Sequence, residues 1–189
     1  YFHAALELDR RINDVGQQVL HLNNIGNVYQ FQGRYSDALA GYREALSLSD
    51  PKWTDAWRPR RYSITATNIG VLYEAVGQNE EALKFYRLAE QFGSHLLPDE
   101  RGQLLANMGT LYRRLGDHLQ ALRTYAQARA VFAKARHFDR EINVIANIGV
   151  VFSLDLHDYL RADTFFSEAI RLAEATRSPR REALSRLYR

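Results

Sequence analysis

Four asparagines occur in the same short sequence pattern along the chain, and their side chains could recognise a polypeptide backbone. Asn24, Asn68, Asn107 and Asn147 each precede a glycine by two residues and an aromatic ring by five. A carboxamide presents two N–H donors and one C=O acceptor, which complement the C=O and N–H groups of an extended peptide. Each such hydrogen bond nets about 0.5–1.5 kcal/mol, so several predict a modest affinity. The alternative is that these asparagines bond a neighbouring helix and hold the fold together, and the sequence leaves both roles open.

Helical periodicity identifies the residues that would share a face with these asparagines. At about 100° per residue, Asn107 points roughly 150° away from the packing side of its helix. The residues expected on the same face are Leu20, Asn27 and Phe31; Ile64, Val71 and Ala75; Gln103, Thr110 and Arg114; Asn143, Val150 and Leu154. Arg113 and Arg114 would suit an acidic group of a ligand; the alternative is that both are merely solvated.

A second candidate contact lies in the segment from Ser49 to Arg61. Aromatic rings beside arginines can stack on a partner or on bases. The alternative is that the rings fill a gap between repeats and the arginines form a solvated rim. The residues in question are Trp53, Trp57, Arg58, Arg60 and Arg61.

Catalytic and metal-binding patterns do not occur in this sequence. The 6 histidines are scattered, without an HExxH pair or metal-ligand spacing. No nucleophile elbow or glycine-rich phosphate loop after a strand is present. With 0 cysteines there are no disulfides and no cysteine ligands. We therefore expect no enzyme, no metal and no cofactor.

The asparagines belong to a repeat, and the repeat predicts the elements that position them. They lie 44, 39 and 40 residues apart. After each comes a turn and then an alanine–aromatic–alanine cluster with offsets of four and three residues. The glycine would let a neighbouring helix approach closely, and the small alanines would flank the facing ring. The clusters are Ala38, Tyr42 and Ala45; Ala82, Tyr86 and Ala89; Ala121, Tyr125 and Ala128; Ala162, Phe166 and Ala169.

The turns between the helices are also recognisable. Gly33, Gly77 and Gly116 stand where a helix C-cap adopts the left-handed conformation. The fourth unit has Leu156 at this position and one extra residue before Ala162, so we expect that turn to be rebuilt around Asp155, His157 and Asp158. Each unit therefore reads as helix, tight turn, helix, and no strands are expected.

These repeated residues resemble the tetratricopeptide repeat (TPR) family over almost the whole chain. The spacing near 40 exceeds the family's usual value of about 34. It is similar to the long-repeat variety of kinesin light chains, LGN-type polarity adaptors and bacterial signalling proteins. The resemblance implies an all-α, right-handed superhelical solenoid of stacked antiparallel helix hairpins, whose inner-wall asparagines hold a peptide in a concave groove. The lysine and arginine clamp of chaperone-binding relatives is absent.

The repeats define the expected organisation. We expect a single TPR-like solenoid fragment over 1–189 whose parent chain continues in both directions. Its parts are 1–11 (second helix of a truncated repeat), 13–49, 54–94, 98–136 and 138–176 (repeats 1 to 4), and 179–189 (start of a further helix).

The sequence favours a protein–protein interaction scaffold or sensor that binds an extended peptide or a partner helix. We expect it to be a regulatory part of a larger multidomain signalling protein, with another domain of the same chain as one candidate ligand. The alternatives are an architectural, self-associating solenoid and a nucleic-acid-binding helical repeat.

Composition and charge narrow the choice of partner. The net charge is +3 and charged residues make up 25% of the chain, so no nucleic-acid partner is expected. No apolar run is long enough to span a bilayer, and no membrane partner is expected. The absence of cysteine and of a signal peptide suggests a cytoplasmic location.

Overall fold

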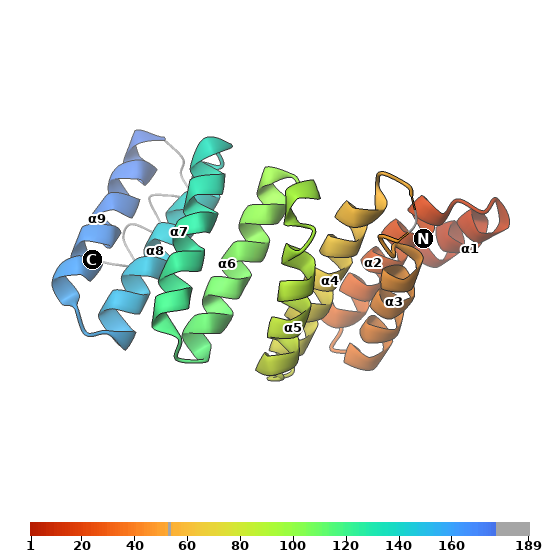
Figure 1. Ribbon diagram of the computed structural model, residues 1–189, viewed down its shortest axis with the longest axis horizontal. Helices are drawn as coiled ribbons and strands as arrows, with labels where there is room; N and C mark the ends of the chain where they lie inside the picture. Colours follow the sequence, from red (N-terminus) through yellow and green to blue (C-terminus); the bar gives the residue numbers. More distant parts are fainter. Residues whose placement is uncertain (53, 177–189) are drawn as a thin grey trace. The chain divides into compact units, whose positions relative to one another are not determined.

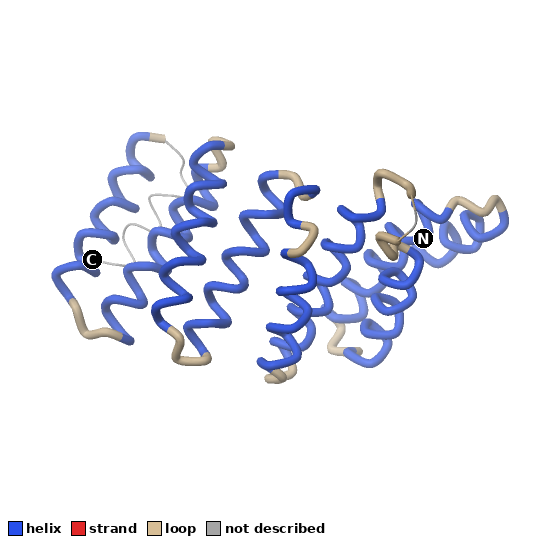
Figure 2. Tube along the Cα trace, viewed as in Figure 1, coloured by secondary structure: helices blue, strands red, loops and turns tan. Residues whose placement is uncertain are grey.

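The computed structural model describes residues 1–52 and 54–176, and every regular element within these ranges is a helix (Figures 1 and 2). The expected all-α class is therefore confirmed. The α-helices are α1 (Phe2–Arg11), α2 (Val15–Phe31), α3 (Tyr35–Leu48), α4 (Arg58–Ala75), α5 (Asn79–Glu90), α6 (Pro98–Arg114), α7 (His118–Lys134), α8 (Phe138–Val150) and α9 (Tyr159–Ala175). A 3-10 turn, η1 (Gly93–His95), follows α5, and a π-helical turn, η2 (Val151–Asp155), follows α8.

The helices pack in consecutive antiparallel pairs: α2 with α3, α4 with α5, α6 with α7, and α8 with α9. They group into two compact units, where unit 1 is Tyr1–Leu96 and unit 2 begins at Leu97. From the sequence we expect a single repeat array over 1–189. Helix α1, in the range expected to be half a repeat, packs against α2. The further helix expected at 179–189 lies outside the described residues.

Close approach of the paired helices depends on one glycine in each first helix. A Cβ atom built on each glycine would fall inside the van der Waals radius of the ring on the second helix. Tyr42, Tyr86 and Tyr125 are at most 1% exposed, so these rings have no room to retreat. The sequence predicts this packing correctly. The distances from the added Cβ to the nearest ring carbon are 2.4 Å for Gly26 and Tyr42, 2.5 Å for Gly70 and Tyr86, 2.6 Å for Gly109 and Tyr125, and 2.6 Å for Gly149 and Phe166.

Three of the four hairpin turns use the expected glycine. Gly33, Gly77 and Gly116 have φ angles of +75°, +78° and +79°, in the left-handed region that side chains disfavour. The following residue then closes the turn through its backbone: Arg34 N–H, for example, donates to Tyr29 C=O at 2.8 Å. This is the usual glycine-dependent end of a helix.

The fourth turn accommodates its extra residue in a different way. The end of α8 continues into the π-helical turn η2. A π-helical turn accommodates one additional residue without ending the helix. His157 takes the left-handed conformation with φ +54°, and Asp158 N–H donates to Phe152 C=O at 2.8 Å. The Asp158 side chain then accepts from Arg161 N–H and begins α9. The turn is rebuilt around the residues the sequence indicates.

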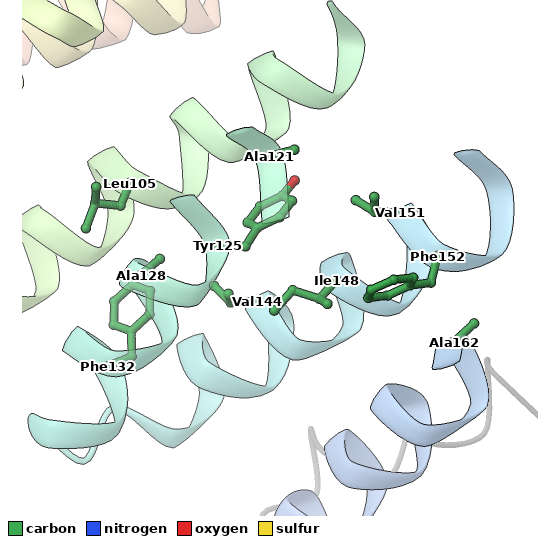
Figure 3. Packing of buried hydrophobic residues seen from close by; sticks show 10 residues of the cluster. All are labelled: Leu105, Ala121, Tyr125, Ala128, Phe132, Val144, Ile148, Val151, Phe152 and Ala162. Atoms are coloured by element: carbon green, nitrogen blue, oxygen red, sulfur yellow. The ribbon is translucent and has the colours of Figure 1, made fainter. Parts of the chain in front are cut away.

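The core of unit 2 shows how the repeats join (Figure 3). Tyr125 and Phe132 of α7 lie against Val144 and Ile148 of α8, and all four are buried. Each such side chain contributes about 1.5–3 kcal/mol through burial. Gly102 makes room for Phe132, whose ring would lie 2.4 Å from an added Cβ. The sequence pattern does not reveal this second glycine contact.

Candidate functional site

The face of unit 1 formed by α2 and α4 carries a depression of about 400 Å³. We call it the unit 1 wall. Phe31 is 94% exposed there, so an apolar ring stands beside several carboxamides. The lining residues are Asn27, Gln30, Phe31, Tyr35, Asn68, Val71 and Ala75. All but Gln30 and Tyr35 are residues that the sequence places on this face.

The buried ring of Tyr42 fixes the carboxamide of Asn27. Its hydroxyl passes between α2 and α3 and donates to Asn27 Oδ1 at 2.6 Å, with Gln30 Oε1 at 3.0 Å. Burial raises the pKa of Tyr42, so the hydroxyl keeps its proton and remains a donor. Because Asn27 Oδ1 is engaged, the amide nitrogen is the group of Asn27 that remains for a further hydrogen bond.

Asn68 is held in the opposite sense. Its Nδ2 donates to Asn23 Oδ1 at 2.9 Å, and Asn23 Nδ2 in turn donates to Val19 C=O and Thr65 Oγ1, each at 2.9 Å. Asn23 is only 6% exposed. This network joins α2 to α4, which is the structural role considered for the asparagines. It engages the nitrogen of Asn68, so Oδ1 is the group of this carboxamide that remains as an acceptor.

The face of unit 2 formed by α6 and α8 has a smaller depression of about 130 Å³. We call it the unit 2 wall. It contains five residues expected from the sequence: Gln103, Asn107, Thr110, Asn143 and Asn147. Asn143 is exposed and the others are half-buried. The lining also includes Ala106, Phe132, Arg140 and Val144.

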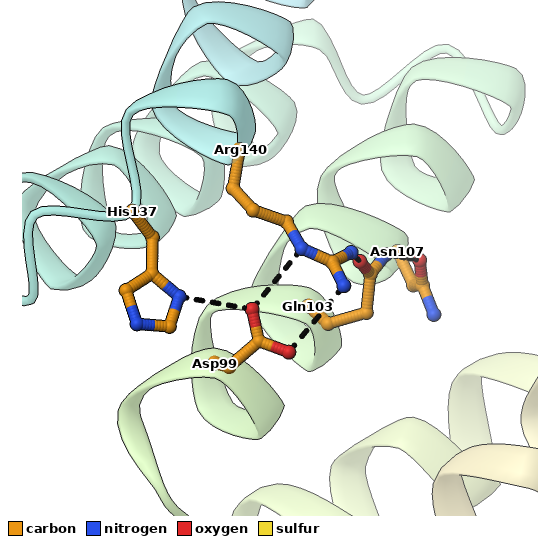
Figure 4. A network of polar contacts seen from close by, with 5 residues as sticks. All are labelled: Asp99, Gln103, Asn107, His137 and Arg140. Atoms are coloured by element: carbon orange, nitrogen blue, oxygen red, sulfur yellow. Dashed lines mark hydrogen bonds and ion pairs between the residues drawn. The ribbon is translucent and has the colours of Figure 1, made fainter.

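A chain of polar contacts orients Asn107 (Figure 4). Asp99 pairs with His137 at 3.1 Å and with Arg140 Nε at 3.0 Å. The same guanidinium donates to Gln103 Oε1, and Gln103 Nε2 donates to Asn107 Oδ1 at 2.8 Å. Asn107 Oδ1 is therefore occupied, and its amide nitrogen is the group offered outward.

Seven residues expected on this face lie outside both depressions: Leu20, Asn24, Ile64, Arg113, Arg114, Val150 and Leu154. Asn24 and Val150 are half-buried on their helices. Arg113 Nε pairs with Asp155 Oδ2 of η2 at 2.6 Å, so it joins α6 to the rebuilt turn. Arg114 is exposed at the end of α6 and makes contacts within the protein.

The segment before α4 is tied into unit 1. Trp57 packs against the cluster of Leu6 and Val19, and the Arg58 guanidinium lies 4.7 Å from the Trp57 ring. Arg58 also donates to Leu48 C=O and pairs with Asp55 at 2.5 Å. Arg60 and Arg61 are half-buried and make contacts of their own; Trp53 lies outside the described residues.

The structure presents neither a metal site nor a membrane helix in the ranges it describes. No group of three or more histidines, aspartates or glutamates within 1–52 and 54–176 could hold a metal ion. None of the helices in these ranges is long and apolar enough to cross a membrane.

Helix pairs that repeat with a glycine–ring contact define a helical-repeat protein of the hairpin type. Models of the tetratricopeptide repeat match residues 61–134 and 100–175, and a further model of the same repeat matches 19–49. The chain belongs to the tetratricopeptide repeat family. No curated protein sequence matches it.

Solved structures confirm the fold at low sequence identity. BtubC (BKLC) from P. vanneervenii is 22% identical with a TM-score of 0.81, over 94% of this chain and 73% of that one. The STAND protein with a tetratricopeptide repeat sensor from Pyrococcus horikoshii is 18% identical with a TM-score of 0.74, over 97% and 28%. The Rap conjugation gene regulator of plasmid pLS20, in complex with the Phr* peptide, is 18% identical with a TM-score of 0.63, over 85% and 44%. The chain thus spans less than half of the latter two.

Proposed function

We propose that the unit 1 wall binds an extended peptide segment of a protein partner, with the unit 2 wall offering a second contact of the same kind. The chain then acts by binding rather than by catalysis. One observation carries this proposal: Asn27, Asn68 and Asn107 are each held at one end of the carboxamide, so that the other end is presented in a fixed orientation.

The two asparagines of the unit 1 wall present complementary groups. Asn27 offers an N–H donor and Asn68 offers a C=O acceptor, which matches the C=O and N–H groups of an extended backbone. Their orientation is set before binding by Tyr42 and Asn23. Pre-organised side chains lose less entropy when a ligand binds.

The rest of the unit 1 wall suggests the side chains of the ligand. Phe31 is almost fully exposed, and Val71 and Ala75 line the same depression. These groups favour apolar ligand side chains on the side of the strand that faces the wall. The backbone would supply the polar contacts and the apolar residues the remaining affinity.

The compared proteins agree with a sensing or scaffolding role. One structural neighbour is a conjugation gene regulator in complex with a peptide, and another carries a tetratricopeptide repeat sensor. We propose that this chain is likewise a regulatory part of a longer signalling protein. Its ligand is a separate protein or another domain of the same polypeptide.

The test is selection of a peptide from a phage-displayed random library against the chain, followed by titration calorimetry. Asn27→Ala and Asn68→Ala should each lower the affinity of the selected peptide, by about 2- to 10-fold per hydrogen bond. Gln91→Ala, an exposed amide at the end of α5, is the matched control and should bind as the parent does. Equal binding by all four proteins would place the peptide elsewhere.

A further inference from the structure

A separate depression lies between α7 and α9 in unit 2, with α8 and η2 as its floor. Its volume is about 500 Å³, and it shares no lining residue with the unit 2 wall. We call it the α7/α9 depression. On α7 it is bordered by Ala126, Ala130 and Ala133, which follow one another at helical spacing and are exposed. These small side chains leave the space between the two helices open.

The floor of the α7/α9 depression is apolar. Ile148 of α8 and Phe152 of η2 are 5% and 8% exposed, and Phe165 of α9 stacks on Phe152 with ring centroids 5.4 Å apart. Figure 3 shows Ile148, near the end of α8, beside Phe152 of η2. An apolar group placed here would displace water from aliphatic and aromatic surface, which favours binding.

One wall of the depression carries a buried carboxylate with incomplete charge compensation. Glu141 lines the depression and is 7% exposed. Arg129 Nη2 lies 2.5 Å from Glu168 Oε1, whereas Arg129 Nε lies 3.8 Å from Glu141 Oε1. One guanidinium therefore serves two carboxylates, and the closer pairing is with Glu168. A local charge of about −1 remains beside the apolar floor.

The proton affinity of Glu141 agrees with this charge imbalance. Burial raises the pKa of Glu141, the Arg129 guanidinium lowers it in part, and the Glu168 carboxylate raises it again. A buried carboxylate in this condition gains from any further cation that reaches it. Arginine and lysine side chains supply such a charge at the end of a flexible apolar stem.

We propose that the α7/α9 depression is a second binding site, which takes an apolar side chain of a protein partner together with a lysine or arginine that reaches Glu141. The apolar side chain fills the space over Ile148 and Phe152, and the cation completes the pairing of the two carboxylates. Because this site shares no lining residue with either peptide-binding wall, a partner could occupy it while the walls hold a peptide. It does not depend on the proposed peptide binding.

The experiment uses three small probes that share a phenyl ring on a four-carbon chain and differ in the terminal group: the cation phenylbutylammonium, the neutral phenylbutanol and the anion phenylbutyrate. Each is titrated into the whole chain and followed by two-dimensional amide NMR. We expect shifts confined to residues around the depression, with the ammonium bound about tenfold more tightly than the alcohol and the carboxylate most weakly.

Variants separate the two parts of the site. Glu141→Gln should reduce the ammonium to the affinity of the alcohol, whereas Glu174→Gln, an exposed glutamate at the end of α9, should change nothing. Ala130→Phe should weaken all three probes, because its ring occupies the apolar space. Thermal melting of each variant shows that the fold persists.

Two results would overturn the proposal. If the three probes bind alike in the parent chain, the carboxylate does not select a cation. If the shifts map outside the depression or Ala130→Phe leaves binding unchanged, the depression is not the site. Neither result bears on the peptide walls, whose asparagines are unchanged in these variants.

Discussion

Replacing Gly70 with alanine tests the glycine–ring packing that shapes each hairpin. A Cβ at this position lies 2.5 Å from two carbons of the Tyr86 ring, about an ångström inside ordinary contact. The ring is fully buried, and its hydroxyl is bonded to Glu74 Oε2 at 2.8 Å. Tyr86 therefore cannot retreat without losing packing and a hydrogen bond.

Two opposing effects set the size of the change. Overpacking of a filled core costs about 1–3 kcal/mol, while alanine is favoured over glycine inside a helix by about 1 kcal/mol. We expect a net loss of about 0–2 kcal/mol in the free energy of unfolding, or up to about 8 °C in Tm for a chain of this length.

Gly41→Ala supplies the matched control in the same unit. A Cβ on Gly41 of α3 meets Leu22 C=O at 3.5 Å and Gly26 N at 4.0 Å, so only the helix-favouring effect remains. This variant should melt about 2–4 °C above the parent. Both variants are compared with the parent by far-UV circular dichroism. A Gly70→Ala protein as stable as Gly41→Ala would show that the ring contact does not limit the fold.

Three further predictions concern single side chains. Tyr42→Phe removes the donor to Asn27, so peptide affinity by calorimetry should fall about 2- to 10-fold; unchanged affinity would refute the orienting role. Glu141→Gln should be more stable than the parent to urea at pH 7, because burial raises the pKa of Glu141 above its ordinary value of 4.5. That advantage should shrink as the pH falls and vanish below this value, where both side chains are neutral; a constant advantage would contradict the reasoning. His157→Gly relieves a left-handed side chain with φ +54° and should add about 1 kcal/mol of stability. A lower Tm would mean that the imidazole contributes more than the backbone costs.

The repeated fold could be predicted because the same residue types recur at the same spacing in every unit. Glycine recurs opposite a ring and a second glycine ends three of the first helices, so each pattern has a local physical cause. The fourth turn lacks its glycine and has an extra residue, and the sequence indicates that it is rebuilt. It does not indicate that a π-helical turn absorbs the residue, since this depends on the packing of Val151 and Phe152.

The walls were only partly predictable, because a helical wheel gives a direction but not a partner. Asn24 is the residue in register with Asn68, yet its neighbour Asn23 makes the bond to Asn68. Whether Asn23 or Asn24 contacts α4 depends on where α2 and α4 cross, and the crossing point cannot be read from the sequence. Arg113 was expected to face a ligand, but the rebuilt turn brings Asp155 to it.

The tyrosines of the packing pattern could have predicted further polar contacts, because their hydroxyl groups need hydrogen-bond partners. A buried tyrosine usually bonds through its hydroxyl, so tyrosine in place of phenylalanine implies a polar partner across the helix. Tyr42 reaches Asn27, Tyr86 reaches Glu74, and Tyr125 lies 3.0 Å from Thr110 Oγ1. The α7/α9 depression had no comparable signal, because it depends on the spacing between two helices.

The central claim is that the unit 1 wall holds the backbone of a peptide through oriented carboxamides. The most direct measurement is an N-methyl scan of the selected peptide, paired with an alanine scan of its side chains. We expect one methylated N–H, the donor to Asn68 Oδ1, to cost about tenfold in affinity for the parent chain and little for Asn68→Ala. Alanine at the same position should cost much less. If every N-methylated peptide binds the parent as tightly as the unmodified one, the asparagines do not hold a backbone and the account is wrong.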